Sequence, residues 1–473
     1  MNQPSNLTNR KRTFIFINLI LTCIALTMLS TALTTALPAI VADLQISVTT
    51  GQWLTSGYSL AMAIVMPLTA FLMNRVPTKK LYLSALVIAL IGMVLCALAP
   101  NFPIMMMSRI LQAIGNGILI SMAQVILLTI YPMDRIGAIM GWYGLSITAA
   151  PVIAPTLAGM IVDKLNWNAI FYIVGAIVFV SLIWALNVFE DVLDVTKKKF
   201  DLLSFLLSAV TFGGFTLGFG NLGTYGFASL PVLGALLVGL IGGILFAHRQ
   251  MKAAVPFLDL RVLKTKEYAL SVFGSILLYL VLMGSSMLMP LYVQSILGKS
   301  ATISGLVVFP GSLVSAFLSP IAGRIYDKVG IRIITIIGGS SLVLSNIGMF
   351  FIHIHTGIWM AVCLNILRCA ATGCLLMPFV TWGNKNIPPE LTAHGTALLT
   401  SLRTVAGAIG TAVFVGIMNT VARNSHTLTG SAALLHGMNV SFLVMTVASG
   451  LLLFTGLFLI KDSRTEVLIE VEN

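Results

Sequence analysis

Charged residues are scarce in this 473-residue chain: only 9% are Asp, Glu, Lys or Arg, against about 25% in an ordinary soluble domain. A soluble protein of this length needs far more charge to cover its surface. A surface that faces lipid must instead be apolar, because lipid offers no partner to polar groups. With 58% apolar residues, the composition predicts an all-α polytopic membrane protein.

Several chemical signatures are also missing. The sequence contains no HExxH, no GxSxG and no GxxxxGK[ST] element, which argues against a zinc protease, a serine hydrolase and an ATP-driven pump. No acid pair lies within an apolar run, so a membrane-embedded enzyme is kept only as an alternative from another class. The five cysteines fall inside apolar runs without metal-type spacing. We therefore predict no metal, no cofactor and no disulfide.

Fourteen apolar runs approach or exceed the ~20 residues that a helix needs to cross a hydrocarbon core of about 30 Å. The seventh and eighth are short and glycine-rich, and their Gly-xxx-Gly spacing would allow two helices to approach closely. The predicted spans are 14–40, 52–73, 81–100, 103–130, 137–161, 168–188, 202–220, 230–247, 268–295, 302–325, 332–353, 357–382, 393–421 and 437–460.

The basic residues are distributed unevenly between the two sides of these spans. With a cytoplasmic N-terminus, only Lys164, Lys299 and Arg423 fall outside, three arginines lie within spans, and the remaining 21 of 27 basic residues are cytoplasmic. This asymmetry predicts an even number of helices with both termini in the cytoplasm. It also explains the net charge of +12 by membrane orientation, so we predict no nucleic-acid binding.

Two parts of the chain repeat each other. Residues 67–74 and 320–327 are similar at an offset of 253 residues, and Arg109 and Arg368 lie 259 residues apart in similar surroundings. Paired halves are a transporter architecture, with the substrate site between them near the bilayer midplane. We predict two six-helix halves, 1–200 and 261–473, separated by an inserted two-helix segment and cytoplasmic loop at 201–260.

Short motifs then point to one family. The first span ends in Ala36-Leu37-Pro38, and the second carries Trp53 and Tyr58 with four residues between them. With these elements the chain resembles the major facilitator superfamily, and within it the fourteen-helix drug/proton antiporters of the EmrB/QacA type. The resemblance covers most of the chain and implies a major facilitator fold.

The loop after the second span and its copy in the second half resemble the family's G-x-L-x-D-R-x-G-R-K element. Asn74 and Arg75 stand in the first copy, and Arg324 and Asp327 in the second. A carboxylate at a helix end can meet the N-terminus of a neighbouring helix and so latch one conformation. Because Asn74 cannot supply a full charge, we expect the weaker latch in the first half. A loop that is basic only for topology is the alternative.

The fourth span carries Arg109 and Gln112, which match the family's R-x-x-Q-G element with Ala113 in place of its glycine. A charge within a span is costly and is usually functional. The resemblance implies that Arg109 assists proton movement or polar contacts. An arginine that snorkels toward the outer membrane surface is the alternative.

The fifth span resembles the family's antiporter motif through Pro151, Pro155 and Gly159. Proline lets a helix bend, and small residues let a partner helix slide closely past. The resemblance implies export, although ordinary helix packing would use the same residues. Three of the motif's glycines are replaced by alanine, at 150, 154 and 158.

Acidic residues are absent from the middle of every predicted span, although the family usually carries an Asp in the first span, where Leu29 stands here. The first span instead has hydroxyls, among them Thr31 and Thr34, which either line a polar path or pack helices. Arg109, Arg368 and Arg403 lie within spans. This excess of arginine over acid predicts an anionic, zwitterionic or neutral substrate rather than a permanent dication.

The leading prediction is a secondary active transporter, not an enzyme, that exports small amphipathic compounds of the multidrug type by alternating access. The resemblance implies protons as the coupling ion and a multi-pass location in the cell membrane of a bacterium. The partners expected are a small-molecule substrate and membrane lipid. The predicted substrate or proton pathway comprises Arg109, Gln112, Arg368, Arg403, Thr31, Thr34, Trp53 and Tyr58. Export of an endogenous anionic or lipid-like metabolite is the alternative.

Overall fold

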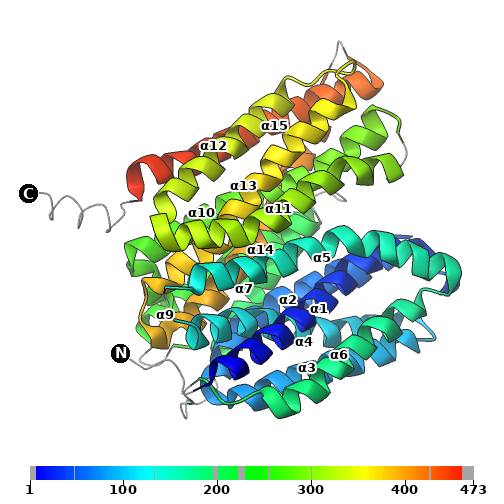
Figure 1. Cartoon of the computed structure of the whole chain (residues 1–473). Helices are drawn as coiled ribbons and strands as arrows, with labels where there is room; N and C mark the ends of the chain where they lie inside the picture. Colours follow the sequence, from blue (N-terminus) through cyan, green and yellow to red (C-terminus); the bar gives the residue numbers. More distant parts are fainter. Residues whose placement is uncertain are drawn as a thin grey trace, which may run out of the picture.

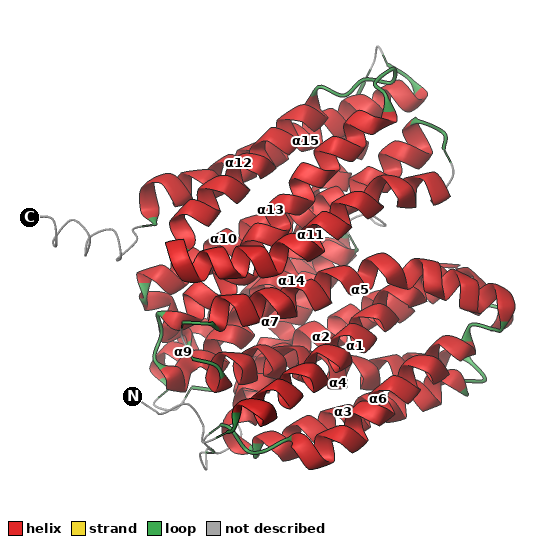
Figure 2. Cartoon of the chain, in the orientation of Figure 1, coloured by secondary structure: helices red, strands yellow, loops and turns green. Residues whose placement is uncertain are grey.

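The computed structural model describes residues 7–46, 48–132, 134–193, 195, 201–221, 229–253, 256–299, 301–425 and 428–460. Within these ranges every regular element is a helix and no strand occurs (Figure 2). Thirteen of the described helices are long and apolar enough to cross a membrane, and α5 is a further helix of 29 residues in the same bundle. The predicted all-α polytopic membrane protein with about fourteen spans is confirmed.

The first six helices pack on one another through the pairs α3–α4, α3–α6, α1–α5, α1–α6 and α2–α4. They form the lower part of Figure 1. Their bounds are α1 (Asn9–Asp43), α2 (Val48–Arg75), α3 (Thr78–Ala97), α4 (Phe102–Ile130), α5 (Ile136–Lys164) and α6 (Asn168–Val188).

The last six long helices pack in the corresponding pairs and form the upper part of Figure 1. Two of them end in a π-helical turn, η2 (Tyr292–Ile296) and η4 (Thr455–Leu459). Their bounds are α10 (Lys266–Leu291), α11 (Ala301–Val329), α12 (Ile331–Phe350), α13 (Ile358–Lys385), α14 (Thr392–Arg423) and α15 (Gly430–Phe454); the short turns η1 (Leu260–Lys264) and η3 (Pro389–Leu391) precede α10 and α14.

The inserted pair, α7 (Leu202–Gly220) and α9 (Leu230–Lys252), packs tightly. A Cβ at Gly214 would lie 2.7 Å from the Cα of Gly239, so the predicted close approach of these glycine-rich helices is confirmed. Asp201 caps α7 and forms an ion pair with Arg249 of α9 at 3.0 Å. α7 also packs against both α2 and α14. The pair therefore covers one side of the seam between the two groups of helices.

Helix ends differ from the predicted spans by a few residues, and most at the last helix. α15 begins at Gly430, seven residues before the predicted start. Hydropathy marks only the part of a helix that crosses the hydrocarbon, whereas the helix continues into the polar boundary layer. The predicted division of the chain at residues 200 and 260 stays a prediction.

α1 begins and α15 ends at the same end of the bundle, at the left of Figure 1. We call this end the termini side and the other the opposite side. The two groups of helices meet mainly through α5 against α11 and α13, and through α2 against α14. In Figure 1, α5 and α11 lie closer together on the termini side and diverge toward the opposite side.

Candidate functional site

Arg109 of α4 is buried, with 1% of its surface exposed. Its Nε donates a hydrogen bond to the carbonyl oxygen of Leu54 (3.2 Å), and its Nη1 donates to Oε1 of Gln112 (2.6 Å). The guanidinium carbon lies 4.1 Å from the ring centroid of Tyr58 on α2. Gln112 in turn donates to the carbonyl oxygen of Gly92 on α3 (2.9 Å). Three predicted site residues, Arg109, Gln112 and Tyr58, thus form one buried unit that links α2, α3 and α4.

Trp53, which was predicted together with Tyr58 from the motif of the second span, is not part of this unit. Trp53 is 42% exposed and stands five residues from Tyr58. Tyr58 has a different second partner, because Asn116 of α4 donates a hydrogen bond to its hydroxyl. Asn116 therefore belongs to the unit, and Trp53 does not.

Arg368 of α13 is 4% exposed, and its Nη2 donates a hydrogen bond to Oδ1 of Asn365 one turn earlier. Asn365 also donates to the carbonyl oxygen of Val308 on α11 (3.3 Å). The Nε of Arg368 has no hydrogen-bond partner. This arginine repeats the arrangement of Arg109, in which a side-chain amide one turn away accepts from the guanidinium, but it is less fully paired.

Arg403 of α14 is 5% exposed and is the least paired of the three. Its Nε and Nη1 are buried without a hydrogen-bond partner. Its guanidinium carbon lies 4.7 Å from the ring centroid of Tyr279 on α10. Within the described chain no carboxylate lies within ion-pair distance of Arg403, Arg109 or Arg368. The interior of the bundle therefore holds three guanidinium groups and no acid paired with them.

Two hydroxyls in the middle of α1, those of Thr27 and Thr31, are hydrogen-bonded within their own helix. Thr31 donates to the carbonyl oxygens of Thr27 (3.2 Å) and Met28 (3.1 Å), and Thr27 donates to Cys23. Thr31 is half-buried and Thr34 is exposed. These bonds satisfy the Thr31 and Thr27 hydroxyls without a second helix, so neither of the two predicted alternatives, a polar path or helix packing, gains direct support.

Two contacts join the halves on the termini side. Asp327 near the end of α11 accepts hydrogen bonds from the backbone N–H groups of Gly137 and Ala138, 2.9 Å each, at the start of α5. Asn74 near the end of α2 is hydrogen-bonded to Nε2 of His394 near the start of α14 (3.1 Å). The two contacts are related by the internal repeat. Each places a polar side chain from the end of one helix at the beginning of a helix in the other half.

The arginines of the two loop motifs, Arg75 and Arg324, are exposed. The N-terminus of α5 supplies two hydrogen bonds to Asp327. His394 also has a second partner, since its Nδ1 accepts from the backbone N–H of Asp259 (3.2 Å). From the sequence His394 is one of several groups that could titrate, with Asp43 and Asp327, and none of them has a favourable predicted position. In the structure His394 lies at the seam between the halves.

One face of α5 is packed at one end and open at the other. Gly137, Gly141 and Gly144 contact α11 or α13 so closely that a Cβ at Gly141 would lie 2.5 Å from the carbonyl oxygen of Ser319. The spacing of three and four residues continues this face through Pro151 and Pro155 to Gly159. At Gly159 a Cβ would meet no described atom within 4 Å. The side chain of Pro155 lies outside the described residues, and Pro151 is half-buried.

The small stripe at positions 150, 154 and 158 is buried, with at most 3% of the surface of each alanine exposed. Ala150 lies nine residues beyond Gly141, which is half a turn around the helix from it, and α5 also packs against α1 of the first half. The expectation that this stripe lets a partner helix slide past stays a prediction.

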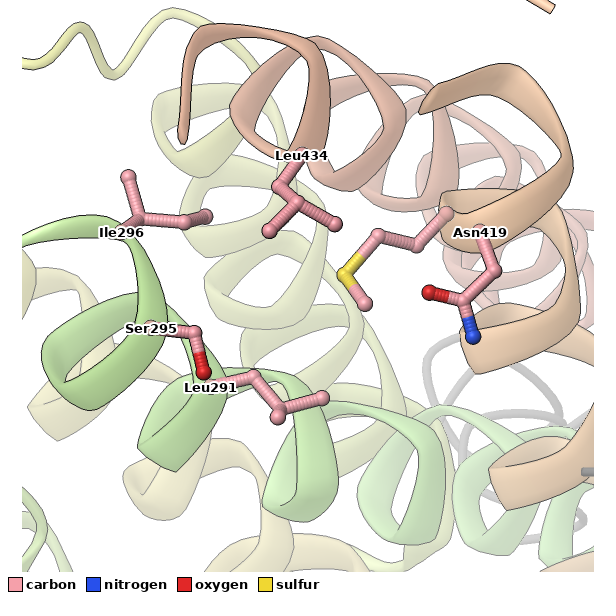
Figure 3. A pocket seen from close by; sticks show the side chains of 6 residues that line it. Leu291, Ser295, Ile296, Asn419 and Leu434 are labelled. Atoms are coloured by element: carbon pink, nitrogen blue, oxygen red, sulfur yellow. The ribbon is translucent and has the colours of Figure 1, made fainter. Parts of the chain in front are cut away.

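A pocket of about 190 Å³ lies within the second half, near its opposite side (Figure 3). It opens between the end of α10 with η2 and the facing parts of α14 and α15, and it contains none of the predicted site residues. It therefore lies apart from the seam between the halves. Its lining residues are Leu291, Ser295, Ile296, Met418, Asn419 and Leu434.

Several residues of these clusters were not predicted, namely Asn116, Asn365 and Tyr279. Asn116 and Asn365 stand one or two turns from a predicted arginine on the same helix, so helical spacing could have found them. Tyr279 comes from another helix than Arg403, and only the fold brings the two together.

Known proteins resemble the chain in sequence and in fold. The model of the Major Facilitator Superfamily matches residues 15–411. The chain is 38% identical to the uncharacterized MFS-type transporter YcnB of Bacillus subtilis (strain 168), with 88% of each chain covered. It is 35% identical to the lincomycin resistance protein LmrB of the same organism, with 82% and 81% covered. The solved structure of the human organic anion transporter MFSD10 (TETRAN) has a TM-score of 0.64 at 14% identity, with 93% of this chain and 100% of that chain covered. The chain, a multi-pass membrane protein, belongs to the major facilitator superfamily of transporters.

Proposed function

We propose that this protein is a secondary active transporter that exports small amphipathic compounds across the plasma membrane by alternating access, with both termini in the cytoplasm. Its similarity to the lincomycin resistance protein LmrB supports export of compounds of the multidrug type. The loop charges support the orientation, because 21 of 27 basic residues fall on the termini side of the predicted spans.

The observation that carries the proposal is a pair of glycines on each of the two facing helices. Gly141 and Gly159 of α5 are 18 residues apart, which is five turns and about 27 Å along one helix face. Gly323 and Gly305 of α11 have the same separation. Gly141 and Gly323 are packed against the other half, whereas neither Gly159 nor Gly305 would place a Cβ within 4 Å of a described atom. Matching small surfaces at both ends suit two halves that rock about the middle, so that the second pair of surfaces closes when the first opens.

Proton coupling forms part of the proposal and rests on relatedness, since the family includes many proton-coupled members. In this chain the candidate proton carriers at the seam are Asp327 and His394, both engaged in contacts that tie the halves together on the termini side. A group that holds a closed state in one protonation form and releases it in the other would couple proton movement to the conformational change.

Transport into inverted membrane vesicles tests the proposal. Vesicles from bacteria that express the protein should accumulate lincomycin when energised, and an uncoupler that collapses the pH gradient should abolish the accumulation. The matched control is the Gly159→Trp variant, in which a large side chain would keep the opposite side from closing. Accumulation that is equal with and without the protein would contradict export. Accumulation that survives the uncoupler would contradict proton coupling alone.

A second candidate is export of an endogenous anionic or lipid-like metabolite. It is favoured by the three buried arginines, for which no acid partner is found in the described chain. Metabolite profiling of the medium from a deletion strain separates the candidates. A single anionic compound that disappears from the medium would favour the metabolite, and an unchanged profile with lost drug resistance would favour the multidrug exporter.

A further inference from the structure

Arg403 lies at the seam between the two halves, above the termini-side contacts. It is nine residues beyond His394 along α14, which places it about 14 Å deeper in the bundle. Tyr279, against which its guanidinium lies, comes from α10 of the same half. α14 also packs against α2 and α4 of the first half, and Oγ1 of the next residue, Thr404, lies 3.6 Å from Sδ of Met66 on α2. Arg403 is therefore buried on a helix that packs against the other half, deeper in the bundle than the termini-side contacts.

The guanidinium of Arg403 lacks the acceptors that its burial requires. Arginine is permanently charged and carries five N–H donors, and a buried charged donor without an acceptor is costly. Arg109 provides the comparison inside the same protein, because the Leu54 carbonyl and the Gln112 amide accept from its Nε and Nη1. On Arg403 the same two nitrogens, Nε and Nη1, have no partner. The fold thus pairs one buried arginine from within and leaves two donors of the other for an acceptor from outside.

The surroundings of Arg403 restrict what that acceptor can be. Tyr279 contributes an aromatic ring rather than a hydrogen-bond acceptor to the guanidinium, whose carbon lies 4.7 Å from the ring centroid. The Tyr279 ring covers one face of the guanidinium, so the open donors of Arg403 are presented edge-on. A planar guanidinium edge matches the two oxygens of a carboxylate or a sulfonate. An aromatic or aliphatic body next to that group would find the Tyr279 ring as a neighbour.

We propose that Arg403 binds the anionic group of the transported compound, a carboxylate or sulfonate attached to an aromatic or aliphatic body. This inference rests on the proposed export function, and it assigns the substrate class by chemistry: amphipathic monoanions in preference to neutral compounds of the same shape. The Nε and Nη1 donors supply the charge-assisted hydrogen bonds, and the Tyr279 ring lies against the face of the guanidinium. In the described part of the chain no carboxylate forms an ion pair with Arg403. The anionic group of a substrate would therefore not compete with an acid of the protein for these donors.

Two fluorescent probes that share one anilinonaphthalene body test the proposal. 1-Anilinonaphthalene-8-sulfonate carries a sulfonate, and N-phenyl-1-naphthylamine lacks it. Their dissociation constants are measured on the full-length protein in lipid nanodiscs, with empty nanodiscs subtracted. Arg403→Gln should weaken binding of the sulfonate at least tenfold and change binding of the neutral probe less than twofold. The matched control is Arg423→Gln, which removes the same charge from an exposed position on the same helix and should change neither value.

The outcomes separate this inference from a general loss of structure and from the proposed function. Equal weakening of both probes, or unchanged sulfonate binding, would overturn the assignment. If Arg403→Gln does not yield monodisperse protein, Arg403→Lys replaces it, because lysine keeps the charge and loses the planar edge; sulfonate binding should then weaken at least threefold, again without change for the neutral probe. Because binding is measured without transport, failure of the assignment leaves export intact, whereas failure of export is seen only in the vesicle assay.

Discussion

The Asp327 carboxylate accepts a hydrogen bond of 2.9 Å from each of two backbone N–H groups, those of Gly137 and Ala138. Asp327 lies near the end of α11 in the second half, and the two amides open α5 in the first half. The first N–H groups of a helix have no partner within the helix and, with the helix dipole, favour a negative charge. This contact therefore holds the termini side closed, and its geometry leads to the first two predictions.

Asp327→Asn should loosen the termini side, because an amide offers one acceptor oxygen and no charge. Hydrogen bonds to a charged group contribute about 1.5–3 kcal/mol each, so the amides of Gly137 and Ala138 should exchange with deuterium at least tenfold faster. Mass spectrometry of the peptide that contains the first turn of α5 measures this rate. The control is Asp134→Asn, which neutralises an exposed acid in the adjacent loop. Equal exchange in Asp327→Asn and the wild type would contradict the latch.

Asn74→Asp should strengthen the matching contact in the first half. The new carboxylate would lie at the position where Asn74 now meets His394, 3.1 Å from its Nε2, and would favour the protonated imidazole. If this charge-assisted pair forms only in the state that is closed on the termini side, it stabilises that state by about 1.5–3 kcal/mol. The export rate should then fall about tenfold. Asn74→Ala, which removes the hydrogen bond, should destabilise the state that is closed on the termini side. Export by Asn74→Asp that is faster than export by the wild type would contradict this assignment.

Gly141 and Gly159 offer a matched pair of substitutions on one face of α5. Gly141→Leu would force the side chain against Ser319 and Pro320, whose nearest atoms lie 2.5 and 2.7 Å from the ideal Cβ. Gly159→Leu meets no described atom in this state and should leave folding unchanged. Deuterium exchange in the first turn of α5 should become faster in Gly141→Leu, which pushes the termini side open. It should become slower in Gly159→Leu, which hinders closure of the opposite side. Shifts in the same direction would contradict rocking of the two halves.

Helix number and position could be predicted from the sequence because the bilayer imposes a length on every span. The predicted spans 168–188 and 202–220 coincide with α6 and α7. The contacts between halves could be predicted only in part. The repeat related Asn74 to Asp327, and both lie at the seam. The partners of these two residues could not be predicted, because hydropathy does not say which helix of the other half begins opposite a given helix end.

The three arginines illustrate the same limit. Their burial followed from their place within apolar runs, and all three are at least 95% buried. The difference in their hydrogen bonding could not be predicted from the sequence. Arg109 is paired because Leu54 of another helix turns a carbonyl toward it, and Arg403 is unpaired because Tyr279 offers it only a ring face. Such differences depend on how each helix is rotated about its axis and at what angle it crosses its neighbours. Apolar side chains are compatible with several such arrangements, so the sequence does not select one.

The last prediction concerns Arg109, and it reverses the usual order of conservative and non-conservative substitutions. Arg109→Lys keeps a buried positive charge, but a single ammonium group cannot replace both the Nε bond to Leu54 and the Nη1 bond to Gln112. Arg109→Gln loses the same bonds but buries no charge. Because no carboxylate in the described chain pairs with Arg109, a charge left with fewer partners is the larger penalty. The lysine variant should therefore be less stable than the glutamine variant by about 1–3 kcal/mol.

Thermal unfolding in detergent, followed by fluorescence-detected size exclusion, measures the order of stability of these variants. Arg423→Lys and Arg423→Gln, at an exposed position on α14, are the controls and should not differ. A lysine variant as stable as the wild type would show that Arg109 acts only as a positive charge, without need of its planar shape.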